Sequence, residues 1–353
     1  MTPFNRFFWL VLLLLATLPP TARAQWQPQH SGTKAHFRAV SAANRNVVWV
    51  GGSGGTFVRT TDGGQTWQPG QVPGADSLDF RDVHAVNKNV AYLMSAGPAE
   101  RGQARIYKTT DGGQTWQLIY QTRQPGVFFD AMDFHTRLEG LVFSDPVDGK
   151  WVVLHTRNGG RTWKPIRPDR LPPVKPGEAA FAASGSSLIF QGLDLENNHF
   201  RYARIASGGA DTARVFYTRN GNLQRWGVSS TPIPAGPTAG IFGLYFSRNG
   251  QRGLAVGGDY KAEKASSQNV AVTRNGGRTW QAATPTTPPG LKEGIGRLGN
   301  RLVVVGPSGS GYTTDWGQTW TKIDDSSYHA IACAGGTCWA VGSDGRIGVF
   351  VMN

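Results

Sequence analysis

The sequence predicts an all-β fold: a seven-bladed β-propeller of four-stranded antiparallel blades, closed by the N-terminal strand pairing into the last blade. Three observations predict it. An octapeptide of the form Thr-Thr-Asp-Gly-Gly-Gln-Thr-Trp occurs six times with variations. Short apolar strands separated by Gly, Asn and Asp turns surround each copy, and no segment after residue 24 has helical periodicity. Residues 25–353 are expected to form one domain.

Residues 1–24 are expected to be a secretory signal peptide. Arg6 precedes an apolar run over residues 7–18, and Ala22-Arg23-Ala24 fits an A-x-A cleavage site. The run is shorter than the roughly 20 residues that a membrane-spanning helix needs. We therefore expect an exported mature chain that begins at Gln25, is periplasmic or extracellular, and has no transmembrane segment.

The chain is strongly basic. Its formal net charge is +13, and the expected leader holds two arginines and no acid, so the mature chain keeps +11. Such a field favours acidic partners, such as anionic glycans, lipid headgroups or acidic peptides, whereas nucleic acid is not expected for an exported protein. The alternative is a solvated basic surface, because no dense Lys/Arg run with interleaved aromatic residues occurs.

The two cysteines, Cys333 and Cys338, are expected to form a disulfide. Gly335 and Gly336 between them fit a two-residue hairpin turn, which would place the cysteines in a non-hydrogen-bonded strand pair. An exported protein permits that bond. A redox site is the alternative, but the spacing is not Cys-x-x-Cys and no nearby group would lower a thiol pKa.

Substitutions among the six copies indicate what each position does. The third position is Asp or Asn, so the turn needs a side-chain oxygen and not a charge. The second glycine, replaced by Asn222 in the fourth copy, is expected at positive φ. The final Trp is expected between neighbouring blades. These structural positions are Asp62, Trp67, Asp111, Trp116, Asn158, Trp163, Asn220, Trp226, Asn275, Trp280, Asp315 and Trp320.

The octapeptide resembles the Asp-box, or BNR repeat, of sialidases, sortilin-type receptors and the photosystem II assembly and stability factor family. Over nearly the whole mature chain the pattern is similar to the exported bacterial branch of that last family, whose members are sometimes labelled oxidoreductases. The resemblance implies a non-catalytic binding or assembly scaffold. The family's basic docking patch has no short motif, so its positions cannot be carried over to this sequence.

Seven blades, not six, are expected. After Trp320 the chain supplies three strands without a fourth, and residues 25–28 around Trp26 mirror the segments that follow the boxes. The N-terminal segment can therefore be the outer strand of the last blade, which removes the open edge between the first and last blades.

Function is expected on the face opposite the boxes, which carries the long connections. Several acidic residues should converge there at the mouth of the central channel, where they could act as acid and base or hold a cation. The alternative is that they cap turns. These weak catalytic candidates are Asp130, Asp145, Asp148, Glu178, Asp259 and Tyr260.

A basic, Pro-rich connector in blades three and four is expected to be extended and to form a docking strip for an acidic peptide. The alternative is a solvated loop. The candidate binding residues are Lys164, Arg167, Arg170, Lys175 and Arg214.

An enzyme is the less favoured alternative. Sialidase resemblance implies an arginine triad and an Arg-Ile-Pro segment, but Arg105-Ile106 is followed by Tyr107. A glycosidase with two carboxylates near Asp145 and Asp259 stays open. The glycines of residues 306–311 have the wrong spacing for a dinucleotide site, and the histidines have no metal-ligand spacing. We expect no cofactor and no metal, a protein or glycan partner, and a monomer.

Overall fold

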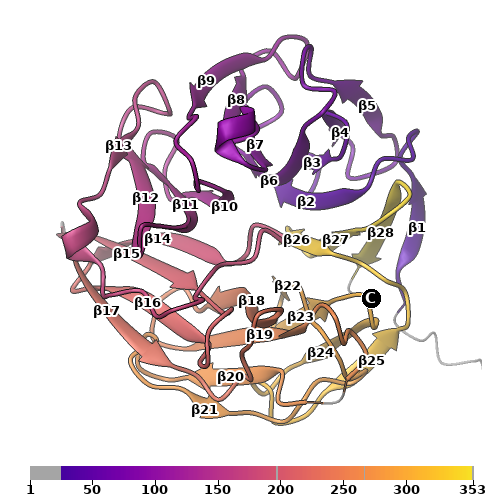
Figure 1. Ribbon diagram of the computed structural model, residues 1–353. Coiled ribbons are helices and arrows are strands. Elements are labelled where there is room, and N and C mark those ends of the chain that lie inside the picture. Colours follow the sequence, from indigo (N-terminus) through magenta and orange to yellow (C-terminus); the bar gives the residue numbers. More distant parts are fainter. Residues whose placement is uncertain (1–24, 196–197, 266, 352–353) are drawn as a thin grey trace, which may run out of the picture.

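The computed structural model describes residues 25–195, 198–265 and 267–351, and these form a ring of seven four-stranded sheets around a central axis (Figure 1). In six sheets the antiparallel strands follow one another along the chain from the axis outward, and in the seventh the outermost strand comes from the N-terminal end. Blade one holds β2 (Phe37–Ala42), β3 (Val48–Gly52), β4 (Thr56–Thr60) and β5 (Gln68–Gln71). Blade two holds β6 (Asp79–Ala85), β7 (Ala91–Ala96), β8 (Arg105–Thr109) and β9 (Gln117–Gln121). Blade three holds β10 (Phe129–Phe134), β11 (Gly140–Val147), β12 (Lys150–Thr156) and β13 (Lys164–Pro165).

The remaining blades follow the same order. Blade four holds β14 (Leu188–Leu195), β15 (Asn198–Ala206), β16 (Arg214–Arg219) and β17 (Asn222–Ser230). Blade five holds β18 (Ala239–Phe246), β19 (Gly253–Asp259), β20 (Val270–Thr273) and β21 (Gln281–Ala282). Blade six holds β22 (Gly294–Leu298), β23 (Arg301–Val305), β24 (Ser310–Thr313) and β25 (Thr321–Asp324). Blade seven holds β26 (Ala330–Ala334), β27 (Thr337–Val341), β28 (Arg346–Val351) and β1 (Gln27–His30).

The N-terminal strand closes the ring, as predicted. β1 pairs antiparallel with β28, with Gln27 opposite Val349. Trp26 is 3% exposed, and the centroid of its ring lies 5.2 Å from the centroid of the Tyr328 ring. Its Nε1 donates to Ser310 Oγ of blade six at 2.8 Å. Trp26 therefore holds blade seven against blade six, and the seven-bladed, all-β prediction is confirmed.

The core lies between the sheets, where apolar faces of adjacent blades meet. Each box Trp packs at the seam between its own blade and the preceding one: Trp67 belongs to the cluster formed with blade seven, and Trp163 to the cluster formed with blade two. The aromatic ring excludes water from the top of the seam. The predicted place of the box Trp is confirmed.

The boxes are turns held by side-chain oxygens. In the first copy, Asp62 Oδ1 accepts from Thr66 N and Thr60 Oγ1, and Gly64 N donates to Thr60 Oγ1. In the third copy Asn158 Oδ1 accepts from Thr162 N in the same way, so this hydrogen bond forms without a charge. Gly63 N also donates to Asn46 O, so the box shares a face with the turn between β2 and β3.

The fourth copy is different. β16 and β17 are joined by a two-residue turn in which Asn220 and Gly221 have φ of 52° and 61°, while Asn222 already belongs to β17. The expectation that Asn222 takes positive φ is therefore wrong. In five copies both glycine positions have positive φ, and Trp316 adopts 65° at the first of them. In the fourth copy, which has one extra residue, β16 and β17 pair as far as Arg219 and Asn222, directly beside the Asn220-Gly221 turn.

The predicted disulfide is present. Cys333 and Cys338 face each other in the register of β26 and β27, with Cα atoms 4.0 Å apart. Gly335 and Gly336 form the two-residue turn with φ of 56° and 85°, values that suit glycine. The cross-link thus closes the hairpin of the last blade.

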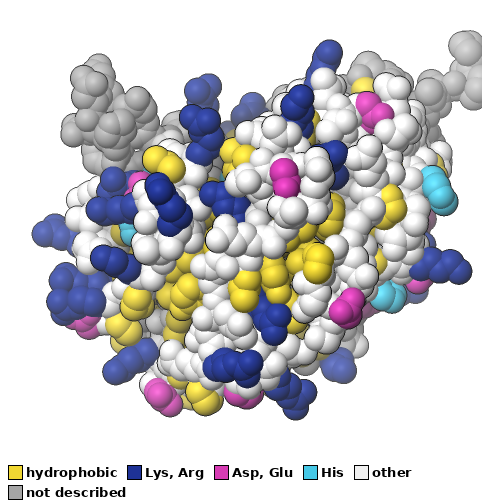
Figure 2. Space-filling view, turned by 90° about the horizontal axis from the view of Figure 1, so that it is seen from above, with side chains coloured by type: hydrophobic (Ala, Val, Ile, Leu, Met, Phe, Trp, Pro, Cys, Tyr) yellow, Lys and Arg dark blue, Asp and Glu magenta, His cyan; other side chains and the backbone are white. Residues whose placement is uncertain are grey.

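The predicted signal peptide, residues 1–24, lies outside the described residues. In the part of the chain that the structure describes, no helix is long and apolar enough to cross a membrane. The helical elements there are two short 3-10 turns, η1 (Ala99–Arg101) and η2 (Pro168–Arg170). The rim seen in Figure 2 carries many Lys and Arg side chains and few acidic ones, in keeping with the positive net charge.

Candidate functional site

A segment of blade four, residues 180–187, spans the channel mouth on the face opposite the boxes, which we call the loop face. Gly185 has φ of 74°, and a Cβ there would lie 2.3 Å from Asp82 Oδ1 of blade two, so only glycine fits. The segment hydrogen-bonds to four other blades: Ala180 N to Asp145 Oδ1, Arg81 Nη1 to Ala182 O, Ser184 Oγ to Glu293 O, and Leu244 N to Ser186 O. It is a floor that blocks the channel.

Above this floor lies a cavity of about 340 Å³, which we call the mouth pocket. Its size is that of a small-ligand or peptide side-chain site. Residues from blades one to six line it. They are Arg38, Arg81, Phe128, Asp130, Asp145, Ala180, Phe181, Ala182, Ala183, Phe242, Tyr260, Glu263 and Glu293.

Four of these side chains reach the pocket by the same local device. In blades one, two, three and five the innermost strand contains a β-bulge after its first residues, where the register with the next strand shifts by one residue. The residues left unpaired there are Arg38, Arg81, Asp130 and Phe242. A bulge re-aims the extra side chain. The ring thus repeats one backbone irregularity and varies the side chain that it presents.

Asp130 and Asp145 lie together on one wall. Asp130 is 1% exposed, and burial together with the nearby charge of Asp145 raises its pKa well above the usual range. Burial also raises the pKa of Asp145, although the bond from Ala180 N opposes this. Asp130 Oδ2 has no hydrogen-bond partner among the described residues. Burial thus favours the protonated form of Asp130, and one of its carboxyl oxygens stays unpaired.

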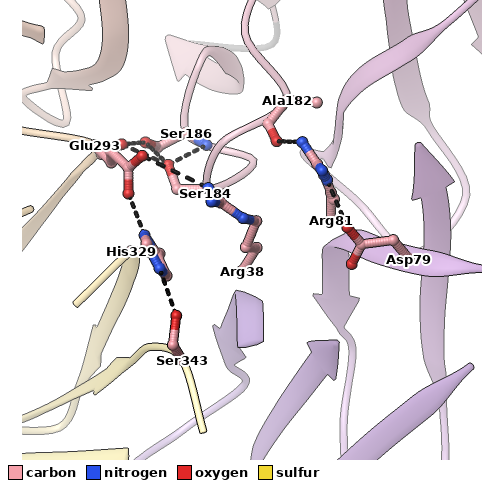
Figure 3. Close-up of polar contacts among 9 residues, drawn as sticks. All are labelled: Arg38, Asp79, Arg81, Ala182, Ser184, Ser186, Glu293, His329 and Ser343. Atoms are coloured by element: carbon pink, nitrogen blue, oxygen red, sulfur yellow. Dashed lines mark hydrogen bonds and ion pairs between the residues drawn. The ribbon is translucent and has the colours of Figure 1, made fainter. Parts of the chain in front are cut away.

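Two arginines supply the positive charge. Arg81 Nε contacts Asp79 Oδ2 at 2.8 Å, and its side chain is 33% exposed (Figure 3). Arg38 Nη1 lies 3.6 Å from Glu293 Oε1, and its side chain is 29% exposed (Figure 3). Both guanidinium groups keep donors that can reach a ligand.

Glu293 is part of a buried chain of polar contacts. His329 Nδ1 lies 2.5 Å from Glu293 Oε2, and His329 Nε2 lies 3.2 Å from Ser343 Oγ (Figure 3). The order of groups is that of a Ser-His-Glu triad. Only Glu293 of the three lines the pocket. These contacts therefore link blade six to blade seven, and they hold in place the Glu293 carboxylate that faces Arg38.

Aromatic side chains form the opposite wall. The rings of Phe181 and Phe242 stack with centroids 4.3 Å apart and planes at 2°. Tyr260 meets Phe181 edge-on at 6.1 Å and is 41% exposed. Exposed Tyr260 beside half-buried Phe181 and buried Phe242 offers apolar contact to a ligand at low entropic cost.

The structure brings Asp130, Asp145 and Tyr260 together but not the other acidic candidates. Asp148 occupies an exposed turn at φ of 50°. Glu178 is 5% exposed and pairs with Arg214, whose Nε donates to its Oε1 at 2.8 Å. Asp259 accepts from Thr238 Oγ1, and this bond and one from Lys261 N lower its pKa. These three residues lie outside the mouth pocket.

The basic connector is not simply extended, because η2 interrupts it. Arg167 pairs with Asp169, and Lys175 Nζ lies 2.8 Å from Asp211 Oδ1. Lys164 and Arg167 line a separate cavity of about 430 Å³ at the outer edge of blade three. Arg170 does not line it, and Arg214 is buried in its pair with Glu178.

Sequence reasoning missed Arg38, Arg81, Phe181 and Glu293. The signal for two of them was present: Phe37-Arg38, Phe80-Arg81 and Phe129-Asp130 are equivalent pairs in the innermost strands of successive blades. Phe181 and Glu293 lie in connections without such a repeat. Among the described residues, no group of three or more His, Cys, Asp or Glu side chains could hold a metal ion.

Comparison with known proteins supports the repeat and the fold. The BNR/Asp-box repeat model matches residues 58–69 and 107–118. None of the curated proteins matches this chain in sequence.

The solved structures similar to this chain are distant in sequence. YCF48 from Cyanidioschyzon merolae has 15% identity and a TM-score of 0.59, with 93% of this chain and 99% of that chain covered. The WD40 propeller domain of Doa1 has 13% identity and a TM-score of 0.60, with 94% and 98% covered. A YCF48 bound to D1 peptide has 15% identity and a TM-score of 0.44, with 96% and 100% covered. The repeat match and the shared fold confirm the expected Asp-box propeller.

Proposed function

We propose that this chain is an exported, non-catalytic scaffold that binds a segment of another protein in the mouth pocket. The observation that carries the proposal is the repeated bulge. Four blades aim Arg38, Arg81, Asp130 and Phe242 at one cavity, and a segment of blade four closes its floor. A cavity of this size with charged and aromatic side chains suits recognition of a peptide segment.

The chemistry of the pocket favours a segment with an acidic group beside an apolar side chain. Arg38 and Arg81 offer guanidinium donors to a carboxylate. Burial raises the pKa of Asp130 and Asp145, which lowers their tendency to carry a charge that would repel such a group. Phe181, Phe242 and Tyr260 offer an apolar wall. This matches the positive net charge, which attracts acidic partners over a distance.

Export is part of the proposal. The Cys333–Cys338 disulfide is compatible with an oxidising compartment, where such bonds persist. Fractionation of the source cells should place the protein outside the cytoplasm, and N-terminal sequencing of the mature protein should begin at Gln25. A mature protein that retains residues 1–24 would contradict export by cleavage.

The binding site is tested by capture from periplasmic extract. The double variant Arg81→Gln/Tyr260→Ala changes two accessible side chains of the mouth pocket and should lose the captured protein. The matched variant Arg167→Gln/Arg170→Gln changes the predicted docking strip and should keep it. Loss with the strip variant and retention with the pocket variant would place the site on the connector instead.

A glycoside hydrolase is the second candidate. The observation that favours it is the pair of neighbouring carboxyl groups, Asp130 and Asp145, in one cavity. Burial and the charge of Asp145 raise the pKa of Asp130, as a general acid needs. The expected partner carboxylate, Asp259, lies outside that cavity. A broad glycoside screen should show turnover that Asp145→Asn abolishes without unfolding. Absence of turnover would leave the binding scaffold as the function.

A further inference from the structure

Blade four has a second cavity on the box face, at its seam with blade five. This seam cavity, of about 330 Å³, lies where the fourth copy closes through the short Asn220-Gly221 turn. Its charged lining residues are Arg204, Arg219 and Arg278, and no Asp or Glu of the described part of the chain lines it. The mouth pocket, in contrast, contains four acidic residues. The seam cavity is therefore a concentrated positive site.

Arg204 is a buried cation that has no anionic partner within residues 25–195, 198–265 and 267–351. It is 2% exposed, and it forms no ion pair among the described residues. Its Nη2 donates to Gly250 O at 2.7 Å, and its guanidinium lies 4.1 Å from the centre of the Phe246 ring. Its Nε has no hydrogen-bond partner in the described part of the chain. Burial lowers the pKa of Arg204 to about 10.

Other blades show that this position does not need a charge. In three other blades an aromatic residue on the second strand donates a hydrogen bond to a backbone carbonyl of the next blade. These residues are Trp49 of blade one, Tyr92 of blade two and Trp339 of blade seven. Arg204 makes the same contact to Gly250 O. A neutral aromatic residue thus suffices to anchor adjacent blades.

Blade four inverts the pairing found in blades one and two. There an aromatic residue on the second strand faces a cation on the third: Trp49 faces Arg59, and Tyr92 faces Lys108. In blade four the second strand carries Arg204 and the third carries Tyr217. The exchange moves the cation inward. Burying an unpaired charge is costly, so a ligand anion at this place is the natural compensation.

The neutral lining residues fit a sugar. Tyr202 and Tyr217 present aromatic rings, and Gln251 and Asn275 present amides that both donate and accept hydrogen bonds. We propose that the seam cavity binds a single acidic sugar unit of an oligosaccharide. The arginines hold its carboxylate or sulfate group, and the amides and phenols contact its hydroxyls. The site is separate from the mouth pocket in place and in ligand class.

The test is calorimetric titration of the full mature chain with oligogalacturonate and with sulfated oligogalactose at low and moderate salt. Binding of either is expected, and the stronger of the two identifies the anionic group. Neutral oligogalactose of equal length should bind weakly or not at all. A poly-glutamate peptide of equal charge should bind more weakly than the acidic sugar. Equal binding of the peptide would overturn the sugar assignment.

Variants locate the site. Arg219→Gln/Arg278→Gln removes two exposed guanidinium groups from the lining and should weaken acidic-sugar binding by roughly tenfold or more. The control Arg248→Gln/Arg274→Gln removes the same charge from exposed residues of blade five that do not line the cavity, and should cost much less. Equal losses in the two double variants would overturn the proposal.

A third variant tests the inverted pair itself. Arg204→Tyr gives blade four the aromatic residue that blade two has at the equivalent position of its second strand. The variant should fold with a thermal midpoint near that of the wild type. It should nevertheless lose acidic-sugar binding. Retained binding would overturn the role of Arg204. If this variant failed to fold, the comparison of the two double variants would still decide. Capture at the mouth pocket should be unchanged in all of them, so this proposal and the protein-binding proposal can fail separately.

Discussion

At the scale of single residues, the side-chain oxygen at the third box position determines the turn. Asp62 accepts hydrogen bonds from Thr66 N, Thr66 Oγ1 and Thr60 Oγ1. In the copies with Asn158 and Asn275 the side-chain amide instead donates to the later threonine. Asp and Asn therefore stabilise the same turn, but the hydrogen bond to the threonine hydroxyl runs in opposite directions: the hydroxyl donates to Asp and accepts from Asn.

This predicts the effect of substitutions at Asp62. Asp62→Ala should lower the free energy of unfolding by about 1 to 2 kcal/mol, because several hydrogen bonds are lost. Asp62→Asn should cost much less, since two natural copies use Asn. Urea denaturation of both variants measures the difference. Equal losses would show that the charge is required.

The acidic residues of the box and of the mouth pocket should respond oppositely to pH. Burial alone would raise the pKa of Asp62, but hydrogen bonds from Thr66 and Thr60 outweigh it and lower the pKa to about 2. Its stabilising contribution is therefore present above the unfolded pKa, near about 4, and lost as pH falls toward 2. For Asp130 burial raises the pKa, so its contribution is present below the unfolded pKa and lost as pH rises through the folded one.

The prediction concerns Asp130→Asn, which removes that titration. Relative to the wild type, the variant should gain stability as pH increases from about 4 to about 7. Asp62→Asn should instead lose stability relative to the wild type as pH increases from about 2 to about 4, where the contribution of the Asp62 charge develops. Denaturation midpoints at several pH values measure both trends. A constant difference for Asp130→Asn would contradict the raised pKa.

At the scale of elements, the strand that closes the ring is the one most distant in sequence from its partners. β1 contributes Trp26, which packs against Tyr328 and Phe350 and bonds to blade six. Trp26→Ala should therefore cost about 3 to 5 kcal/mol of unfolding free energy. Gln27→Ala, in the same strand but exposed, should change it by less than about 0.5 kcal/mol. Similar effects of the two changes would show that the closing strand carries little of the stability.

The strands and blades could be predicted from the sequence for two reasons. The spacing of the box repeats corresponds to one blade per repeat, and residues 25–28 supply the strand that the last blade lacks. The bulges could not, because a bulge is a register shift between two strands and leaves no signature in one strand alone. The path of residues 180–187 was missed for a related reason. Its bonds to four other blades, made by Ala180, Ala182, Ser184 and Ser186, form only when the ring closes.

At the scale of the whole molecule, the two faces of the ring differ in chemistry. The loop face holds a pocket of mixed charge with an aromatic wall, closed below by blade four. The box face holds turns fixed by side-chain oxygens and, at the seam of blades four and five, an arginine-lined cavity. The sequence directed attention away from the boxes, and the pocket with Asp130 and Asp145 lies on the face that it predicted. The converging set, however, includes arginines and aromatic residues that lie far apart in the chain.

The central claim is that a protein segment binds at the mouth pocket of a closed ring. Hydrogen–deuterium exchange of the complex with the captured protein tests it most directly. The account predicts added protection of the amides in residues 180–187 and around Tyr260, with the six box segments unchanged. Protection confined to the box segments, or to the connector around Arg167, with residues 180–187 unaffected, would contradict it.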